Sequence, residues 1–216
     1  MNRLSLLSLL AAPFLLLSTM SISNAALIVS YGPQLNLVQG QTGTLDVLIR
    51  SSDGSDDLSL FSAKFMIAPV AGTGLEFLDP PNDSQYLDPN YIFAGTNIDG
   101  LPSVVGPADT IVTSDGTVGP DGFVTVPTEN RLLVTLDISA MNASANSQFQ
   151  ISLIDDDVTD FLDDGFNPLS IDSESFTNVG VVNVSAVPEP SSVAALGLGA
   201  MGIVGARYRR RQRKQG

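Results

Sequence analysis

Apolar and polar residues alternate along several stretches of the chain, and this alternation constrains its fold more than any other feature. The pattern is clearest over residues 44–50, 60–67, 131–138 and 148–153. A period of two places alternate side chains on opposite faces of a β-strand, so one face of each segment is suited to a core. No part of residues 26–186 has a convincing helical stripe, although a short helical turn fits near residues 160–164.

The connections between these segments are typical of tight turns. Asp-Gly pairs occur at residues 53–54, 99–100, 115–116 and 121–122, and this pair suits turns that need a positive φ. Shorter strands are predicted over residues 26–31, 34–38, 75–78, 111–113, 123–126 and 176–184. About ten short strands with such turns predict an all-β fold, a two-sheet antiparallel β-sandwich of jelly-roll type.

The composition excludes most enzyme chemistry. The 216 residues include no cysteine, histidine or tryptophan. Disulfides, thiolate zinc sites, cysteine nucleophiles, histidine bases and the Ser-His-Asp triad are therefore ruled out. A glycosidase built on two carboxylates would still be feasible, with Glu76 and Glu129 as candidate acids, but any acidic sandwich would supply such residues. We therefore expect a non-enzymatic protein that requires no cofactor.

Charge is distributed very unevenly along the chain. The formal net charge is −13, yet six of the ten basic residues lie within residues 207–216. Residues 26–186 contain only Arg50, Lys64 and Arg131 against 22 acidic residues, a formal charge of −19. A body this acidic repels phosphate backbones, so we expect no nucleic-acid partner.

The first 25 residues have the pattern of a secretory signal peptide. Arg3 precedes an apolar run from Leu4 to Leu17, and small residues end the segment at Ser23-Asn24-Ala25. This order of a basic start, a short apolar run and small residues predicts export by the Sec machinery, with cleavage between Ala25 and Ala26. The alternative is a buried N-terminal helix.

The last 30 residues contain a second, differently ordered signal. Pro188-Glu189-Pro190 precede an apolar, glycine-containing run over residues 193–206, and an arginine-rich end follows. As a helix that run would be about 21 Å long, shorter than the ~30 Å hydrocarbon core of a membrane. The basic end is of the kind that stays in the cytoplasm. The pattern predicts a short transmembrane helix that halts export transiently.

Residues 187–216 closely resemble the PEP-CTERM sorting signal of Gram-negative bacteria, in motif, spacing, apolar span and basic end. The resemblance implies recognition of Pro188, Glu189 and Pro190 by exosortase, a membrane-embedded cysteine transpeptidase, at a cut bond that the sequence does not place. It also implies passage through the inner membrane to the cell envelope, the surface or an exopolysaccharide matrix. An ordinary membrane anchor after a proline-rich linker is the alternative. The expected organisation is a signal peptide (1–25), a β-sandwich (26–186) and a sorting signal (187–216).

The predicted strand layout of the body also resembles cohesin-type and related carbohydrate-binding sandwiches. The shared pattern is an opening strand at residues 26–31, followed by strands at 43–50, 58–67 and 75–78. This resemblance involves no diagnostic motif, and it implies a non-catalytic binding module without specifying its ligand.

One acidic cluster is dense enough to raise the question of a metal ion. Its six carboxylates lie within ten residues: Asp155, Asp156, Asp157, Asp160, Asp163 and Asp164. Bound Ca²⁺ would relieve their mutual repulsion with the oxygen ligands that this ion prefers. The spacing is not that of an Asp-x-Asp-x-Asp-Gly loop, however, and a solvated acidic loop explains the cluster better.

Tyr86 and Tyr91 flank the loop Leu87-Asp88-Pro89-Asn90 and are candidates for stacking on a sugar ring. Packing of this loop against the sandwich is the favoured alternative role. Two hypotheses therefore stand side by side: an exported structural or adhesive protein of the envelope or matrix, and a polysaccharide-binding module with an optional calcium requirement.

Overall fold

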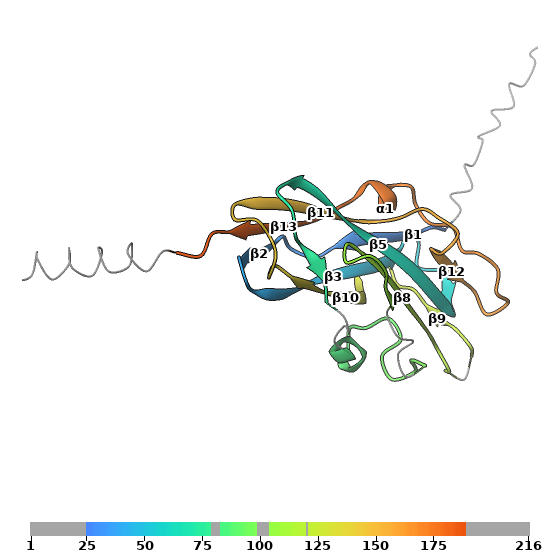
Figure 1. Cartoon of the computed structure of the whole chain (residues 1–216). Helices are drawn as coiled ribbons and strands as arrows, with labels where there is room; N and C mark the ends of the chain where they lie inside the picture. Colours follow the sequence, from blue (N-terminus) through green and yellow to red (C-terminus); the bar gives the residue numbers. More distant parts are fainter. Residues whose placement is uncertain (1–24, 79–82, 99–103, 120, 189–216) are drawn as a thin grey trace, which may run out of the picture.

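The computed structural model describes residues 25–78, 83–98, 104–119 and 121–188. These residues form a β-sandwich, as the alternation predicts (Figure 1). Its first sheet has four antiparallel strands in the order β1-β3-β10-β6: Leu27–Tyr31, Thr42–Ser51, Arg131–Ser139 and Glu76–Phe77.

The second sheet has seven strands and packs against the first. Its order is β2-β13-β11-β5-β8-β7, with β12 also paired to β5: Leu35–Val38, Gly180–Ser185, Ser147–Leu153, Leu60–Ala71, Thr110–Gly116, Val104–Val105 and Asp160–Leu162. Its strands pair antiparallel except β2 and β13, which run parallel. A two-stranded ribbon joins β4 (Asp57–Leu58) to β9 (Val124–Thr125).

The alternating residues of the longest strands meet between the two sheets. The first sheet contributes Leu45, Val47 and Ile49 of β3 and Val134, Leu136 and Ile138 of β10, all buried. The second contributes Phe61, Ala63, Phe65 and Ile67 of β5 and Phe149, Ile151 and Leu153 of β11. Removal of these side chains from water is the main driving force for the fold.

Two predicted elements are wrong in detail. Residues 160–162 form strand β12 rather than a helical turn, because Phe161 inserts into the core and stacks on Phe61 with ring centroids 6.1 Å apart. The strand predicted from residue 176 begins only at Gly180. Helix α1 (Glu174–Thr177) precedes it, and the Asp172 carboxylate accepts a hydrogen bond from the Glu174 backbone N–H at 2.8 Å.

Candidate functional site

The segment around residues 83–94, called here the covering segment, lies beside β10 at the edge of the four-stranded sheet. The 3₁₀ helix η1 (Asp83–Leu87) begins this segment, and the Gln85 side-chain oxygen accepts a hydrogen bond from the Thr135 backbone N–H at 2.5 Å. Further on, the Leu132 N–H donates to the Asn90 carbonyl and the Ile92 N–H to the Leu132 carbonyl, both at 2.9 Å. The segment is thus held along β10 by backbone hydrogen bonds.

A β-bulge in β10 places two leucines side by side on this face. The register between β3 and β10 shifts between Leu132 and Val134, so Leu132 lies opposite Leu48 while Val134 lies opposite Val47 in the core. Bulges redirect side chains at sheet edges and functional sites. Leu48 and Leu132 therefore form an apolar floor on the outward side of the sheet.

A surface pocket of about 350 Å³ opens above this floor. We call it the β3–β10 pocket; its lining residues are Asp46, Leu48, Asp88, Asn90, Asn130 and Leu132. The chain brings them together from three places: strand β3, the loop after η1, and the start of β10. Two carboxylates and two amides thus surround two leucines.

Hydrogen bonds orient the polar wall of the β3–β10 pocket. One Asp46 carboxylate oxygen accepts from the Thr135 hydroxyl at 2.9 Å, and one Asp88 oxygen accepts from the Asn90 backbone N–H at 2.7 Å. The Arg131 guanidinium donates to the Pro89 carbonyl at 3.3 Å and steadies the loop. Each carboxylate has a second oxygen with lone pairs suited to a ligand donor. The pocket therefore combines oriented acceptors with an apolar base.

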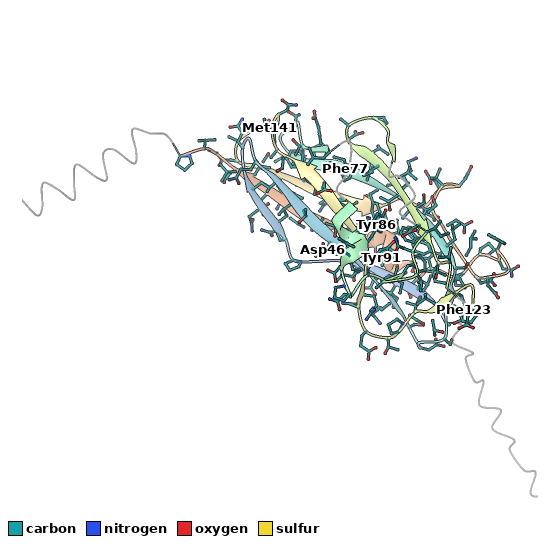
Figure 2. All side chains as sticks on the ribbon, turned by 90° about the horizontal axis from the view of Figure 1, so that it is seen from below. Asp46, Phe77, Tyr86, Tyr91, Phe123 and Met141 are labelled. Carbon is teal, nitrogen blue, oxygen red and sulfur yellow. The ribbon has the colours of Figure 1, made fainter. Side chains whose placement is uncertain are left out.

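The two tyrosines proposed for sugar stacking lie in different environments. Figure 2 shows Tyr86, Tyr91 and Asp46 in one region of the molecule, and the two tyrosine rings meet edge to face with centroids 5.5 Å apart. Tyr86 is partly exposed and packs against the core, and its role in stacking stays a prediction. Tyr91 is fully buried, so its proposed role as a stacking platform is wrong: its ring has no face open to a sugar.

Tyr91 instead anchors the covering segment to the second sheet. Its hydroxyl donates a 2.5 Å hydrogen bond to the carboxylate of Asp115 on β8, which is also fully buried. Burial raises the pKa of the Tyr91 phenol above its ordinary value, and the hydrogen bond to Asp115 raises it further. The phenol is therefore protonated and acts as the donor.

The six carboxylates of the acidic cluster do not converge. Asp156 pairs with the Lys64 ammonium at 2.7 Å, a contact that holds the pKa of the Asp156 carboxyl below its usual value. Asp163 accepts hydrogen bonds from the Asn167 side chain and backbone, which lower its pKa as well. Within the ranges that the structure describes, no three acidic side chains gather in a group that would hold a metal ion. Calcium binding at residues 155–164 stays an untested hypothesis without geometric support.

The loop after β3 contains a second group of acids, which turn geometry explains. One Asp53 carboxylate oxygen accepts from both the backbone N–H and the hydroxyl of Ser55, as in an Asx turn. Asp56 is buried at 6% exposure and accepts from the Ser51 hydroxyl at 2.6 Å. Burial raises the pKa of the Asp56 carboxyl, the Ser51 hydrogen bond opposes this effect, and the neighbouring acids Asp53 and Asp57 add to the increase.

We expect Asp56→Asn to stabilise the protein at neutral pH. The raised pKa means that the folded state binds the Asp56 proton more tightly than the unfolded state does, so the charged form opposes folding at high pH. This penalty disappears as the pH falls through the raised pKa, and the advantage of the variant should vanish below the ordinary aspartate pKa of about 3.9. Urea unfolding at a series of pH values measures the difference. Asp163→Asn is the opposite-sign control, because the pKa of Asp163 is lowered: it should lose stability at neutral pH.

The terminal signals lie mostly beyond the described part of the chain. Ala25 and Ala26 are described, and the Ala26 N–H donates to the Ser52 hydroxyl at 3.0 Å. Pro188 is described and exposed, whereas Glu189, Pro190 and the predicted apolar helix over residues 193–206 lie outside the described residues. Among the described residues, no helix is long and apolar enough to span a membrane.

The β3–β10 pocket was not foreseen from the sequence. Asp46, Asn90 and Asn130 are far apart along the chain and meet only through the pairing of β3 with β10 and the bridge from residue 91 to residue 132. One signal was available: Leu48 is an apolar residue at a position that the alternation of β3 assigns to the outer, polar face.

Comparison with known proteins identifies the C-terminal signal. Residues 186–211 match the family described as the PEP-CTERM protein-sorting motif, as expected from the sequence. This motif implies export across the inner membrane to the cell envelope or surface, with processing by exosortase. Among curated proteins, none matches this chain.

Among solved structures, the body is similar to cohesin modules, the family that its strand layout resembles. A chain of a type I cohesin–dockerin complex from Clostridium thermocellum is 8% identical, with 76% of this chain and 99% of that chain covered and a TM-score of 0.43. A cohesin module of a family 33 glycoside hydrolase from Clostridium perfringens is 10% identical, with 76% and 98% covered and a TM-score of 0.43. These likenesses are loose, and the sandwich is established by its own strand pairing.

Proposed function

Starting from a chain that carries the PEP-CTERM sorting motif and is exported to the cell envelope or surface, we propose that its β-sandwich is a non-catalytic module that binds polysaccharide. The observation that supports this proposal is the β3–β10 pocket, in which Asp46, Asp88, Asn90 and Asn130 surround Leu48 and Leu132. Such a module would retain the exported protein in a polysaccharide matrix and give it an adhesive role.

The pocket has the two kinds of surface that a sugar ring needs. Sugar hydroxyl groups both donate and accept hydrogen bonds, carboxylates accept them, and side-chain amides do both. The C–H face of a sugar ring is apolar and is removed from water when it packs on leucine side chains. A shallow, open pocket of about 350 Å³ can hold one or two sugar units while the polymer continues on either side.

The charge of the site limits the class of polysaccharide. Asp46 and Asp88 both line the β3–β10 pocket, and the body around it has a formal charge of −19. A polymer of uronic acids would bring further carboxylates against these two and be repelled. The proposed ligand is therefore a neutral polysaccharide.

We expect Asp46→Asn combined with Asn130→Ala to weaken binding of a neutral polymer at least tenfold, which corresponds to about 1.4 kcal/mol. The double variant replaces one charge-assisted acceptor by a neutral group and removes one amide, so a bound sugar loses part of its hydrogen bonds at two places in the pocket. Binding of dextran and of other neutral bacterial glucans to residues 26–186 is measured by affinity electrophoresis and calorimetry, with alginate as the uronic-acid polymer.

Asp155→Asn is the matched control, because it changes an exposed aspartate outside the pocket and should leave binding unchanged. Each titration is repeated with a chelator. Because no group of three acids suited to a metal ion lies within the described residues, we expect the affinity to be the same with and without Ca²⁺. Binding that needs Ca²⁺ and is lost in Asp155→Asn would assign the ligand to the acidic cluster instead. Tighter binding of alginate than of the glucans would contradict the proposal that the ligand is a neutral polysaccharide.

A further inference from the structure

The two ends of the sandwich differ in which terminus of the chain they carry. Strand β1 begins at Leu27, whose backbone N–H donates to the Ser170 carbonyl at 2.8 Å, and the chain enters there. Strand β13 ends at Ser185, and the chain leaves the sandwich at the opposite end (Figure 1). The sorting segment is therefore attached to one end of the body only.

The end where the chain leaves contains no ionisable side chain in the segments that build it. We call it the uncharged end; it consists of residues 39–42, 70–74, 140–147 and 185–188, and none of these is Asp, Glu, Lys or Arg. Glu76 lies at its margin, where its carboxylate oxygens accept from the Asn142 side chain at 3.3 Å. Such a gap in charge is unexpected in a body with 22 acidic residues.

Backbone hydrogen bonds join these four segments into one surface. The Gly40 N–H donates to the Ala140 carbonyl and the Gln39 N–H to the Ser185 carbonyl, both at 2.9 Å. The Ser144 N–H donates to the Thr73 carbonyl at 2.8 Å, which connects the remaining segment, 70–74, to residues 140–147. The uncharged end is therefore a built part of the fold.

Three apolar side chains are exposed on this end. Val70 is 54% exposed, Met141 is 61% exposed and Val187 is 55% exposed, and each belongs to a different segment of the uncharged end. Figure 2 shows Met141 at the end of the molecule from which the C-terminal chain departs. A surface with exposed apolar groups and no charge is suited to an apolar or interfacial partner.

Six of the 22 acidic residues of the body lie toward the other end. Residues 52–57 and 160–168 contain Asp53, Asp56, Asp57, Asp160, Asp163 and Asp164. The Ser59 N–H donates to the Leu162 carbonyl at 2.8 Å, which places the two segments next to each other. The body therefore has one acidic end and one uncharged end, and these face in opposite directions.

The remaining chain is too short to hold the uncharged end far from a membrane. Strand β13 ends at Ser185, and the apolar run of the sorting segment begins at Val193 in the sequence. A chain of eight residues extends at most about 29 Å. Part of this length must cross the lipid headgroup layer. While the apolar run is in the membrane, the end of the sandwich at Ser185 stays within about 29 Å of the hydrocarbon core.

We propose that the uncharged end rests on the lipid headgroup surface as long as the sorting segment is attached, with Val70, Met141 and Val187 at the interface. Carboxylates at this end would be repelled by anionic lipid within a Debye length of about 8 Å, and this end has none in its four segments. The exposed apolar side chains gain from leaving water at the interface. The acidic end points away from the membrane, and the β3–β10 pocket on the side of the sandwich stays accessible.

The absence of tryptophan allows a direct test, because one introduced tryptophan is the only one in the chain. Residues 26–216 carrying Met141→Trp or Val70→Trp are reconstituted into vesicles of phosphatidylethanolamine and phosphatidylglycerol. We expect blue-shifted emission that is quenched when brominated lipids replace the ordinary ones, because both side chains lie at the lipid interface. Two variants are used because the substitutions lie in different segments of the uncharged end, Val70 at the end of β5 and Met141 in the turn after β10, and unfolding curves confirm that both are folded.

Phe166→Trp is the matched control, since Phe166 is 72% exposed and lies in the acidic end. Its emission should stay red-shifted and unaffected by brominated lipid. Equal behaviour of all three tryptophans would overturn the proposal. A blue shift of the Met141→Trp and Val70→Trp emission that occurs only after exosortase is added would also overturn it. The partner of the uncharged end would then be a protein rather than lipid.

Discussion

Tyr91→Phe should destabilise the body by about 2–3 kcal/mol, a large effect for the loss of one oxygen atom. The Tyr91 hydroxyl donates to the Asp115 carboxylate at 2.5 Å, and both residues are 0% exposed. Without this donor, one oxygen of the buried Asp115 side chain loses a hydrogen bond that water cannot replace, so the desolvation cost of that oxygen is no longer offset. Equilibrium urea unfolding followed by circular dichroism measures the change.

Two further variants separate this hydrogen bond from the packing of the ring. Tyr31→Phe removes a buried hydroxyl that has no hydrogen-bond partner among the described residues, so it should be neutral or slightly stabilising. In an Asp115→Ala background, Tyr91→Phe should cost at least about 1 kcal/mol less than in the natural chain, because the Tyr91 hydroxyl has already lost its acceptor. Equal costs for Tyr31→Phe and Tyr91→Phe would show that the Tyr91–Asp115 pair adds nothing to stability.

Gly74→Ala should cost about 3–5 kcal/mol, through a steric clash added to backbone strain. Gly74 has a φ of +86°, and a β-carbon there would lie 2.0 Å from the Asn142 carbonyl oxygen. No L-amino acid fits at that distance, so the two loops of the uncharged end must separate. The loss is read from the midpoint of urea unfolding.

Gly40→Ala is the matched control for this substitution. Gly40 has nearly the same φ, +88°, but a β-carbon there would meet nothing within 4 Å. In Gly40→Ala only the strain of the left-handed backbone conformation remains, which costs about 1–2 kcal/mol of stability. Equal losses of stability in Gly74→Ala and Gly40→Ala would contradict this account. They would show that the backbone at residues 74 and 142 moves apart to accept a β-carbon without a free-energy cost.

The long strands were predictable because the alternation of apolar and polar residues within each strand indicates which of its side chains are buried. In β3 and β11 alternate residues are buried and most of these are apolar, and the predicted segments 44–50 and 148–153 differ from the observed strands by only one or two residues at an end. Strands β4 and β12 lack such a pattern, whereas β9 lies within the predicted segment 123–126. Strand β12 forms because Phe161 packs into the core beside the longer β5, and β4 pairs, among the described strands, only with β9.

The site was far less predictable, for two physical reasons. The residues of the β3–β10 pocket are neighbours only through strand pairing, and neither the register nor the bulge at Leu132 is visible in one sequence. The burial of Tyr91 agrees with the favoured prediction that its loop packs against the sandwich, and not with the alternative of sugar stacking. The apolar residues Ile92 and Phe93 that follow it are buried with it, and they were the better guide.

The position of the ligand on the sandwich tests the account most directly. Titration of ¹⁵N-labelled residues 26–186 with oligosaccharides of a neutral glucan, followed by backbone amide shifts, locates the contact surface. We predict the largest shifts at residues 46–48, 88–92 and 130–132, which form and support the β3–β10 pocket. Shifts concentrated at residues 155–164, or no shifts with any neutral polysaccharide that the intact protein is found to bind, would contradict the proposed site.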